Sequence, residues 1–513
     1  MTRERMSGVD TAWLRMDSPG NLMMIVGVQI FAEPLGHADL CRVLGQRLLK
    51  FERFRQKVES DATGYWWVDD PDFQLRRHVV RVRLRGRPGD GQLQALAAKL
   101  AAEPLDPAHP LWQYHLIEHY EGGSAVIVRI HHCIADGIAL VGVTLSLSDS
   151  GERGLPHAGA AAARPAHDGE PEHESHDLLT QLGSLLEPVA NAATAAAETA
   201  GETLARSIEI AGGLVTDARA RSALSALGTR VASDALKLAL MPDDSPTRLK
   251  GRPSGRKAVA WNAPMPLDEV KAVCKVLGVS VNDVLLSCVA GALQHYLEAH
   301  GEFTAGKEIR AMVPVNLRPP NEPLSLGNRF GLVPLTLPIG IANPVERLFD
   351  VRRRMDELKG GYQGPLAFGL LSAIGHAPRQ LQSMVLDYLA HKATAVMTNV
   401  PGPRSAIEIF GRKLSRAMVW VPQSGDIGVG VSILSYDGAV QFGLITDVAV
   451  CSDPQRIVDR FEPEFDRLVM TLSMLPRELL ARGLVDAGEI ERRLFGRRGG
   501  ATRRARSVRA AGS

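Results

Sequence analysis

A stretch of low sequence complexity, residues 151–177, divides this chain into two parts. It consists almost entirely of small, polar and proline residues, with very few bulky apolar side chains. Such a segment cannot bury enough surface to offset the entropy of ordering it. With 513 residues and 45% hydrophobic side chains, the chain is also too long for one ordinary core. We therefore predict two folded domains joined by a linker.

Both parts mix helical and strand patterns, which predicts an α/β fold. In the first domain, residues 1–150, helical spacing over 40–49 is followed by a β-rich run at 125–130. In the second domain, residues 251–490, we expect helices at 267–277 and 282–296 and strands at 258–261, 309–315, 395–397, 429–434 and 440–445.

Two further segments lie outside these domains. Residues 151–250 combine the linker with Ala-rich connecting helices predicted over 178–240. The tail, residues 491–513, carries eight arginines and no acid after Glu491. Because it also lacks an apolar face, we predict that the tail is disordered.

Composition excludes several classes of function. Lys plus Arg is 59 against 57 for Asp plus Glu, so no global field attracts nucleic acid. The five cysteines are never spaced as CxxC, which argues against a disulfide framework or a structural zinc site and favours a reducing compartment. The N-terminus lacks the apolar core of a signal peptide, and the apolar stretch 22–31 is about half the ~20 residues that cross a bilayer. We predict a cytoplasmic protein with a buried strand at 22–31.

The segment 124–137 carries the most specific chemistry. It is predicted to be a strand that ends at His131 and His132, followed by Asp136 and by Gly137, which lets the backbone turn into an apolar helix. Neighbours on a strand face apart, so the two histidines cannot easily share one metal ion. A single oriented imidazole is suited to take a proton from an alcohol near neutral pH. One of the two histidines fits that role.

Other interpretations of this region are weaker. A lone histidine is more often a satisfied structural residue than a catalytic one. Cys133 faces away from His132, and no GxSxG elbow supports a serine nucleophile. The glycines at 425, 428 and 430 lack the spacing of a dinucleotide loop and are more typical of a tight turn.

The HHxxxDG block resembles the signature of the coenzyme-A-dependent acyltransferase superfamily, which includes chloramphenicol acetyltransferase and peptide-synthetase condensation domains. The resemblance implies that His132 is the general base, with His131 supporting it and no covalent acyl-enzyme. It also implies that Asp136 is structural and pairs with a distant arginine, for which Arg318 is the candidate.

Further segments, in order from about residue 7 to 468, resemble the bacterial wax ester synthase and acyl-CoA:diacylglycerol acyltransferase family. The opening motif corresponds to residues 6–14 and the last block to residues 421–425. Between them, the blocks correspond to Pro110, Leu111 and Trp112 (PLW); Asn282 and Asp283 (ND); Arg318 within 314–319; Asn328 and Arg329 (NRF); and Thr398 and Asn399 within 398–403.

Most of these residues also have ordinary structural explanations. Pro110 and Trp112 can be packing residues, and Asn282 before an apolar helix is expected to be its N-cap. Asp283 would then complement the helix dipole in the first turn. Thr398, at a strand end, is a candidate to stabilise the oxyanion of the reaction, as a Ser or Thr does in superfamily relatives.

The resemblance implies two chloramphenicol-acetyltransferase-like domains with mixed sheets and a central channel that holds His132. Acyl-CoA would enter from one side and diacylglycerol or a long-chain alcohol from the other, without a metal or bound cofactor. Because such acceptors live in membranes, we expect peripheral binding to the inner membrane or to lipid droplets, through the helices of 178–240 or the basic tail.

Two alternatives follow from the same residues. The first is a polyketide-associated or condensation-like transferase that takes its acyl group from a carrier protein. The second is a non-catalytic lipid-droplet-binding protein, which the intact His132 and Asp136 disfavour. Neither the acyl-chain length nor the oligomeric state is set by the sequence.

Overall fold

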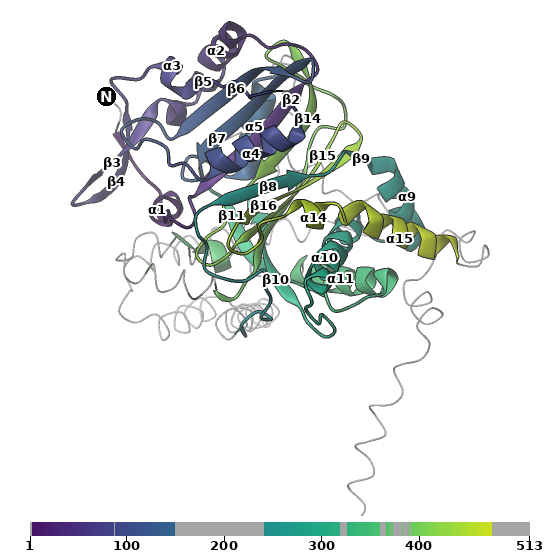
Figure 1. Cartoon of the computed structure of the whole chain (residues 1–513). Coiled ribbons are helices and arrows are strands. Elements are labelled where there is room, and N and C mark those ends of the chain that lie inside the picture. The colour runs from purple at the N-terminus through teal and green to yellow at the C-terminus, as the bar shows by residue number, and fades with distance from the viewer. Residues whose placement is uncertain are drawn as a thin grey trace, which may run out of the picture.

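The computed structural model describes residues 3–86, 88–148, 241–318, 326–359, 366–369, 371–372, 382, 388 and 391–474. These residues form two large mixed β-sheets with helices packed against them, and a small three-stranded sheet in the order β1-β4-β3 (Figure 1). The predicted α/β class is confirmed. The predicted connecting helices at 178–240 and the basic tail lie outside the described residues.

The first large sheet has the strand order β13-β14-β2-β7-β6-β5. Its neighbours are antiparallel except for β5 and β6, which run parallel. Its strands are β2 (Met24–Phe31), β5 (Val79–Arg81), β6 (Trp112–Tyr120), β7 (Gly123–His131), β13 (Glu408–Ile409) and β14 (Arg412–Trp420). The same part of the chain forms helices α1 (Gly8–Arg15), α2 (His37–Gln46), α3 (Leu75–His78), α4 (Asp90–Ala101) and α5 (Gly137–Ser146), and strands β1 (Arg3–Arg5), β3 (Gln56–Asp61) and β4 (Gly64–Asp69).

The predicted buried strand within 22–31 is β2, at the centre of this sheet. Its alternate residues Met24 and Val26 enter a core shared with α4 and β8, whereas Ile25 enters a core shared with α1, α2 and α5. Because a strand that is covered on both faces has no side exposed to solvent, its sequence is a nearly continuous run of apolar residues.

The second large sheet has the order β11-β10-β12-β15-β16-β8, with β9 paired to β16. Strand β12 runs parallel to both β10 and β15, and the other neighbours are antiparallel. Its strands are β8 (Lys257–Trp261), β9 (Met265–Pro266), β10 (Ile309–Asn316), β11 (Phe330–Leu337), β12 (Ala395–Pro401), β15 (Val429–Tyr436) and β16 (Ala439–Asp447). Helices α9 (Leu267–Leu277), α10 (Val281–Ala299), α11 (Pro344–Lys359), α14 (Gln455–Val458) and α15 (Phe461–Ser473) belong to this part.

Two strands, β13 and β14, do not follow the predicted division of the chain at residue 250. Strand β14 belongs by sequence to the second domain, yet it pairs along its length with β2 of the first sheet. Its apolar side chains explain the exchange: Leu414 enters the core around α1 and α2, and Met418 and Trp420 enter the core under α4. By covering an edge of β2, this strand joins the two parts through backbone hydrogen bonds.

The start of α10 corrects one prediction. Asn282 is not the N-cap of this helix; that position belongs to Ser280. The Ser280 side chain accepts the Asp283 N–H, and the Asp283 carboxylate accepts the Ser280 N–H, which is a capping box. Asp283 lies in the first turn, as predicted. Ser-x-x-Asp satisfies two helix-end donors, which an Asn282 cap would not.

Within the described part of the chain, no single helix is long and apolar enough to cross a bilayer. Helices α9 and α10 meet this condition only as a pair, with a bend of 104° between them. Most of α10 is buried in the second core.

Candidate active site

The double histidine lies where β7 ends. The His132 N–H donates to the Met23 carbonyl at 2.7 Å, which holds this segment against the start of β2. His131 Nδ1 accepts the Cys133 N–H at 3.2 Å, so its proton is assigned to Nε2, which lies 3.2 Å from an Asp17 carboxylate oxygen. The hydrogen bond from the Cys133 N–H to the His131 ring fits a supporting role for this residue in the turn.

The His132 imidazole is buried between aromatic rings. The Trp13 ring stacks on it with centroids 4.1 Å apart and planes 19° apart, and Phe330 lies at 5.4 Å. Burial lowers the pKa of His132 to about 4, against the charge of Asp136, which raises it. The imidazole is therefore neutral near pH 7, the form that can accept a proton.

Asp136 holds the loop after His132 in shape. One carboxylate oxygen accepts the Ala139 N–H at 2.9 Å and caps α5, whose first residue is Gly137. The other oxygen accepts from the Arg318 guanidinium at 2.5 Å and from the Arg329 N–H at 2.9 Å. The pairing of Asp136 with Arg318 is therefore present in the structure, and Asp136 is engaged on both oxygens.

The NRF segment is fastened directly to this loop. The Asn328 amide donates to the carbonyl of His132 and to the carboxylate of Asp10, both at 2.8 Å. Just before it, the Gly327 N–H donates to the Ile134 carbonyl at 3.2 Å, with a φ of +102° that favours glycine. Three segments far apart in sequence thus meet at the backbone of His132.

The PLW segment contacts the backbone of His131. The Leu111 carbonyl accepts the His131 N–H at 2.9 Å, and the Pro110 carbonyl accepts the Trp112 N–H. Trp112 is fully buried, and its indole donates to the Phe54 carbonyl at 2.9 Å. These contacts fit the packing interpretation.

Thr398 and Asn399 lie on β12 of the second sheet, and Asn282 lies in the first turn of α10. The Asn399 amide donates to the Asn282 side chain, which ties β12 to the start of α10. The buried Thr398 hydroxyl donates to the Val431 carbonyl on β15 at 3.3 Å. Among the described contacts, none joins these three residues to His132.

Asp10 and Trp13 lie within the opening motif of residues 6–14, but no role at the site was predicted for either residue. Both lie on α1 with their side chains buried, and burial raises the pKa of the Asp10 carboxyl. The sequence contains one indication of such a role for Asp10. Its carboxylate lies among the apolar residues Val9, Ala12 and Trp13. A buried acid needs a partner, which here is Asn328.

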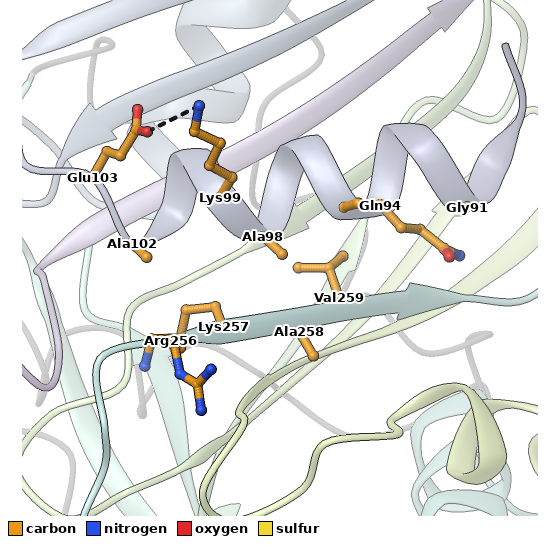
Figure 2. A pocket seen from close by; sticks show the side chains of 11 residues that line it. Gly91, Gln94, Ala98, Lys99, Ala102, Glu103, Arg256, Lys257, Ala258 and Val259 are labelled. Atoms are coloured by element: carbon orange, nitrogen blue, oxygen red, sulfur yellow. Dashed lines mark ion pairs between the residues drawn. The ribbon is translucent and has the colours of Figure 1, made fainter. Parts of the chain in front are cut away.

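No group of three His, Cys, Asp or Glu side chains in the described ranges is placed to hold a metal ion. A cavity of about 570 Å³ lies between α4 and β8 (Figure 2). Its lining does not include His132.

Comparisons with known proteins identify the family. The model of the wax ester synthase/diacylglycerol acyltransferase catalytic domain matches residues 6–285, and the model of the C-terminal domain of that family matches residues 326–469. The chain belongs to this family. It is therefore an O-acyltransferase.

Individual relatives agree with this assignment. A chain named as a probable diacylglycerol O-acyltransferase of Mycobacterium tuberculosis is 29% identical over 440 residues, covering 83% of this chain and 86% of the relative. The solved wax ester synthase/diacylglycerol acyltransferase of Marinobacter aquaeolei shares the fold, with a TM-score of 0.62, 20% identity, and coverage of 92% of this chain and 100% of that one. The first condensation domain of the calcium-dependent antibiotic synthetase aligns with a TM-score of 0.54 at 14% identity, covering 95% of this chain and 98% of that one.

We expect removal of the Trp13 ring to change how this acyltransferase responds to pH. In Trp13→Ala, water reaches the imidazole, the loss of burial raises the pKa of His132, and the acid limb of the kcat profile moves to higher pH. Loss of the stacked position lowers kcat on the order of 10-fold to 100-fold. Trp13→Phe, which keeps an aromatic cover, should retain the acid limb. An unchanged profile in Trp13→Ala would contradict this role.

We expect Arg318→Ala to destabilise the family's HHxxxDG loop. Breaking a buried ion pair is costly, and because Asp136 keeps two N–H donors we expect a loss of about 2 kcal/mol in the free energy of unfolding. Denaturant titration measures it. Arg318→Lys keeps the charge but not the second bond to the Gly327 carbonyl, so it should fall between wild type and Arg318→Ala. Equal stability of all three proteins would exclude the pair as a support.

Proposed function

We propose that this O-acyltransferase moves a long-chain acyl group from acyl-CoA to the hydroxyl of a diacylglycerol, of a long-chain alcohol, or of both. The observation that carries the proposal is the buried, neutral imidazole of His132, held at a strand end by Trp13 and Asn328. The family assignment and the relatives named as diacylglycerol O-acyltransferases support the choice of substrates.

In the proposed reaction His132 is the general base. It takes the proton of the acceptor hydroxyl as the oxygen attacks the thioester carbonyl. The tetrahedral intermediate collapses with cleavage of the C–S bond, and the thiolate takes the proton back from the imidazolium, which releases CoA as the thiol. These reaction steps require no covalent acyl-enzyme, metal or bound cofactor.

The oxyanion of the tetrahedral intermediate needs a hydrogen-bond donor. Thr398 remains the predicted donor, but its hydroxyl is already used by the Val431 carbonyl, so it would have to turn to serve the intermediate. Thr398→Val would test this role through kcat.

Activity with defined substrates tests the proposal. The purified chain should form ester from palmitoyl-CoA with dipalmitoylglycerol or with hexadecanol, and should use palmitoyl-CoA in preference to palmitoyl-acyl carrier protein. Preference for the carrier protein would favour a condensation-like transferase. Binding of lipid without turnover would favour a non-catalytic lipid-binding protein.

The proposal includes peripheral attachment, from the cytoplasm, to the inner membrane or to lipid droplets. Its support is the lipid character of the acceptors and the eight arginines of the tail, because cationic segments are attracted to anionic lipid surfaces. Removing the residues after Glu491 should reduce flotation with anionic vesicles. Unchanged flotation would exclude the tail as the attachment site.

A further inference from the structure

An edge of the first large sheet carries a row of exposed arginines. Strand β5 stands at the end of the strand order and pairs with β6 (Figure 1). Five arginines between residues 76 and 85 are exposed, and we call them the arginine stripe: Arg76, Arg77, Arg81, Arg83 and Arg85. The same ten residues contain no acid, in a chain whose formal net charge is only +2. Positive charge is therefore concentrated at this edge.

The stripe continues past β5 because the chain still follows β6 there. The Val82 N–H donates to the Leu116 carbonyl of β6 at 2.8 Å. Val82 and Leu84 pack against the core beneath α4, and the residues between and beside them are exposed. Alternate residues of an extended chain share a face and lie roughly 7 Å apart. The structure thus places three guanidinium groups in one row, those of Arg81, Arg83 and Arg85.

Counter-charges compensate little of this row. Arg81 lies 3.6 Å from Glu118 of β6, but the two side chains are 61% and 35% exposed, and such pairs are weak. The guanidinium groups of Arg83 and Arg85 form no hydrogen bond or ion pair with a described residue. These two arginines are available to a partner.

The neighbouring elements add little negative charge. Helix α2 also packs against β5, and its single acid, Asp39, already lies 3.1 Å from Arg42. At the other end of the stripe, Arg76 donates to the amide oxygen of Gln74, and Arg77 lies 2.8 Å from a ring nitrogen of His109.

Protection of the sheet edge does not account for the stripe. Exposed edge strands commonly carry charged side chains, which prevent pairing with a strand of another molecule. Charges of either sign serve that purpose, and mixed signs would avoid repulsion between neighbours. Guanidinium groups of one sign placed roughly 7 Å apart repel one another. The single sign therefore indicates an anionic partner.

We propose that the arginine stripe is a docking surface for a bilayer with anionic headgroups. The inference rests on the proposed function, because its acceptors must be drawn from lipid, and it names a surface other than the tail. Guanidinium groups form paired hydrogen bonds with phosphate oxygens. Attraction to an anionic bilayer strengthens binding about fivefold for each arginine at the surface. A nucleic acid fits less well, since residues 76–85 include no Phe, Tyr or Trp on which bases could stack.

The stripe is separate from the base, so docking and chemistry can be measured independently. Arg81 is in register with Leu116 of β6, and Leu116 with Val126 of β7, five residues before His131. Five residues of strand span roughly 15 Å or more. Removing the charges of the stripe should therefore leave kcat with a water-soluble alcohol unchanged.

Flotation of the full chain with vesicles tests the proposal. The stripe variant replaces three arginines by glutamine: Arg81→Gln, Arg83→Gln and Arg85→Gln. We expect its binding to phosphatidylglycerol vesicles to fall on the order of 10- to 100-fold, and added salt to weaken wild-type binding more steeply than that of the variant. The matched control removes the same charge from three exposed arginines of the second half of the chain: Arg248→Gln, Arg252→Gln and Arg256→Gln. It should float as the wild type does.

Four results would overturn the proposal. They are no flotation of the wild type with phosphatidylglycerol vesicles, equal flotation of wild type and stripe variant, equal losses in the stripe and control variants, and loss of DNA binding by the stripe variant at unchanged flotation. The last would assign the stripe to a nucleic acid. An unchanged free energy of unfolding shows that the stripe variant is folded. Failure of the wild type to transfer acyl groups would refute the proposed function but not the flotation result.

Discussion

Replacing His132 by alanine should lower kcat for acyl transfer by ~10²- to 10⁴-fold, the usual contribution of a general base. The reason is geometric as well as chemical. The neighbouring His131 already uses Nδ1 to accept the Cys133 N–H, so that nitrogen is not free to take the proton. KM for acyl-CoA should change much less, because the proton transfer occurs only in the transition state.

Two further variants separate loss of the base from loss of the fold. His132→Gln keeps a polar side chain beneath Trp13 but cannot accept the proton, so it should be as inactive as His132→Ala. His119→Ala removes an exposed histidine of β6 and should leave kcat unchanged. Full activity in His132→Ala with unaltered unfolding would exclude His132 as the base.

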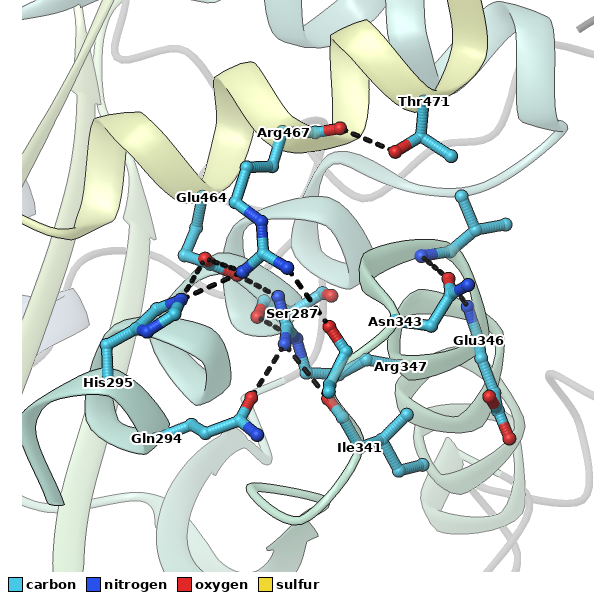
Figure 3. A network of polar contacts seen from close by, with 12 residues as sticks. Ser287, Gln294, His295, Ile341, Asn343, Glu346, Arg347, Glu464, Arg467 and Thr471 are labelled. Carbon is cyan, nitrogen blue, oxygen red and sulfur yellow. Dashed lines mark hydrogen bonds and ion pairs between the residues drawn. The ribbon is translucent and has the colours of Figure 1, made fainter. Parts of the chain in front are cut away.

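The second large effect should come from Glu464, far from the chemistry. Its buried carboxylate on α15 accepts from His295 at 2.9 Å and from Arg467 at 2.6 Å, and also pairs with the buried Arg347 of α11 (Figure 3). Burial raises the pKa of Glu464, but these contacts outweigh burial and lower the pKa to about 2. The backbone of Gly291 on α10 lies so close that an added Cβ would overlap this ion pair.

We expect Glu464→Ala to lower the free energy of unfolding by about 3 to 5 kcal/mol, because Arg347 is left buried without its counter-charge. Denaturant titration measures the loss. Glu462→Ala, at an exposed site on the same helix, is the matched control and should be neutral. Replacing both partners by apolar residues, Arg347→Met with Glu464→Leu, should recover most of the stability. A neutral Glu464→Ala would show that the network contributes little.

The sequence predicted the elements that carry the site because their patterns are local. The run of apolar residues before His131 and the Asp136-Gly137 turn are set by strand alternation and helix capping, and the structure has both. The resemblance to the family supplied the partner of Asp136, since Arg318 lies 182 positions away and no local pattern connects the two.

What could not be predicted depends on contacts made only in three dimensions. The stacking of Trp13 on His132 and the bridge from Asn328 to the His132 carbonyl join distant segments. The exchange of β14 into the first sheet is likewise invisible to periodicity, because a strand pattern does not state its partner. The N-cap at Ser280 differs in kind, because the local pattern Ser-x-x-Asp that forms the capping box is present in the sequence itself.

Direct transfer of the acyl group to a hydroxyl, with His132 as base, fixes the ratio of the two products. The most direct measurement follows CoA thiol and ester together when the purified chain receives palmitoyl-CoA with and without dipalmitoylglycerol or hexadecanol. We expect one ester for each thiol released, and almost no thiol without an acceptor. Steady release of thiol without ester would identify a thioesterase and exclude direct transfer to a hydroxyl.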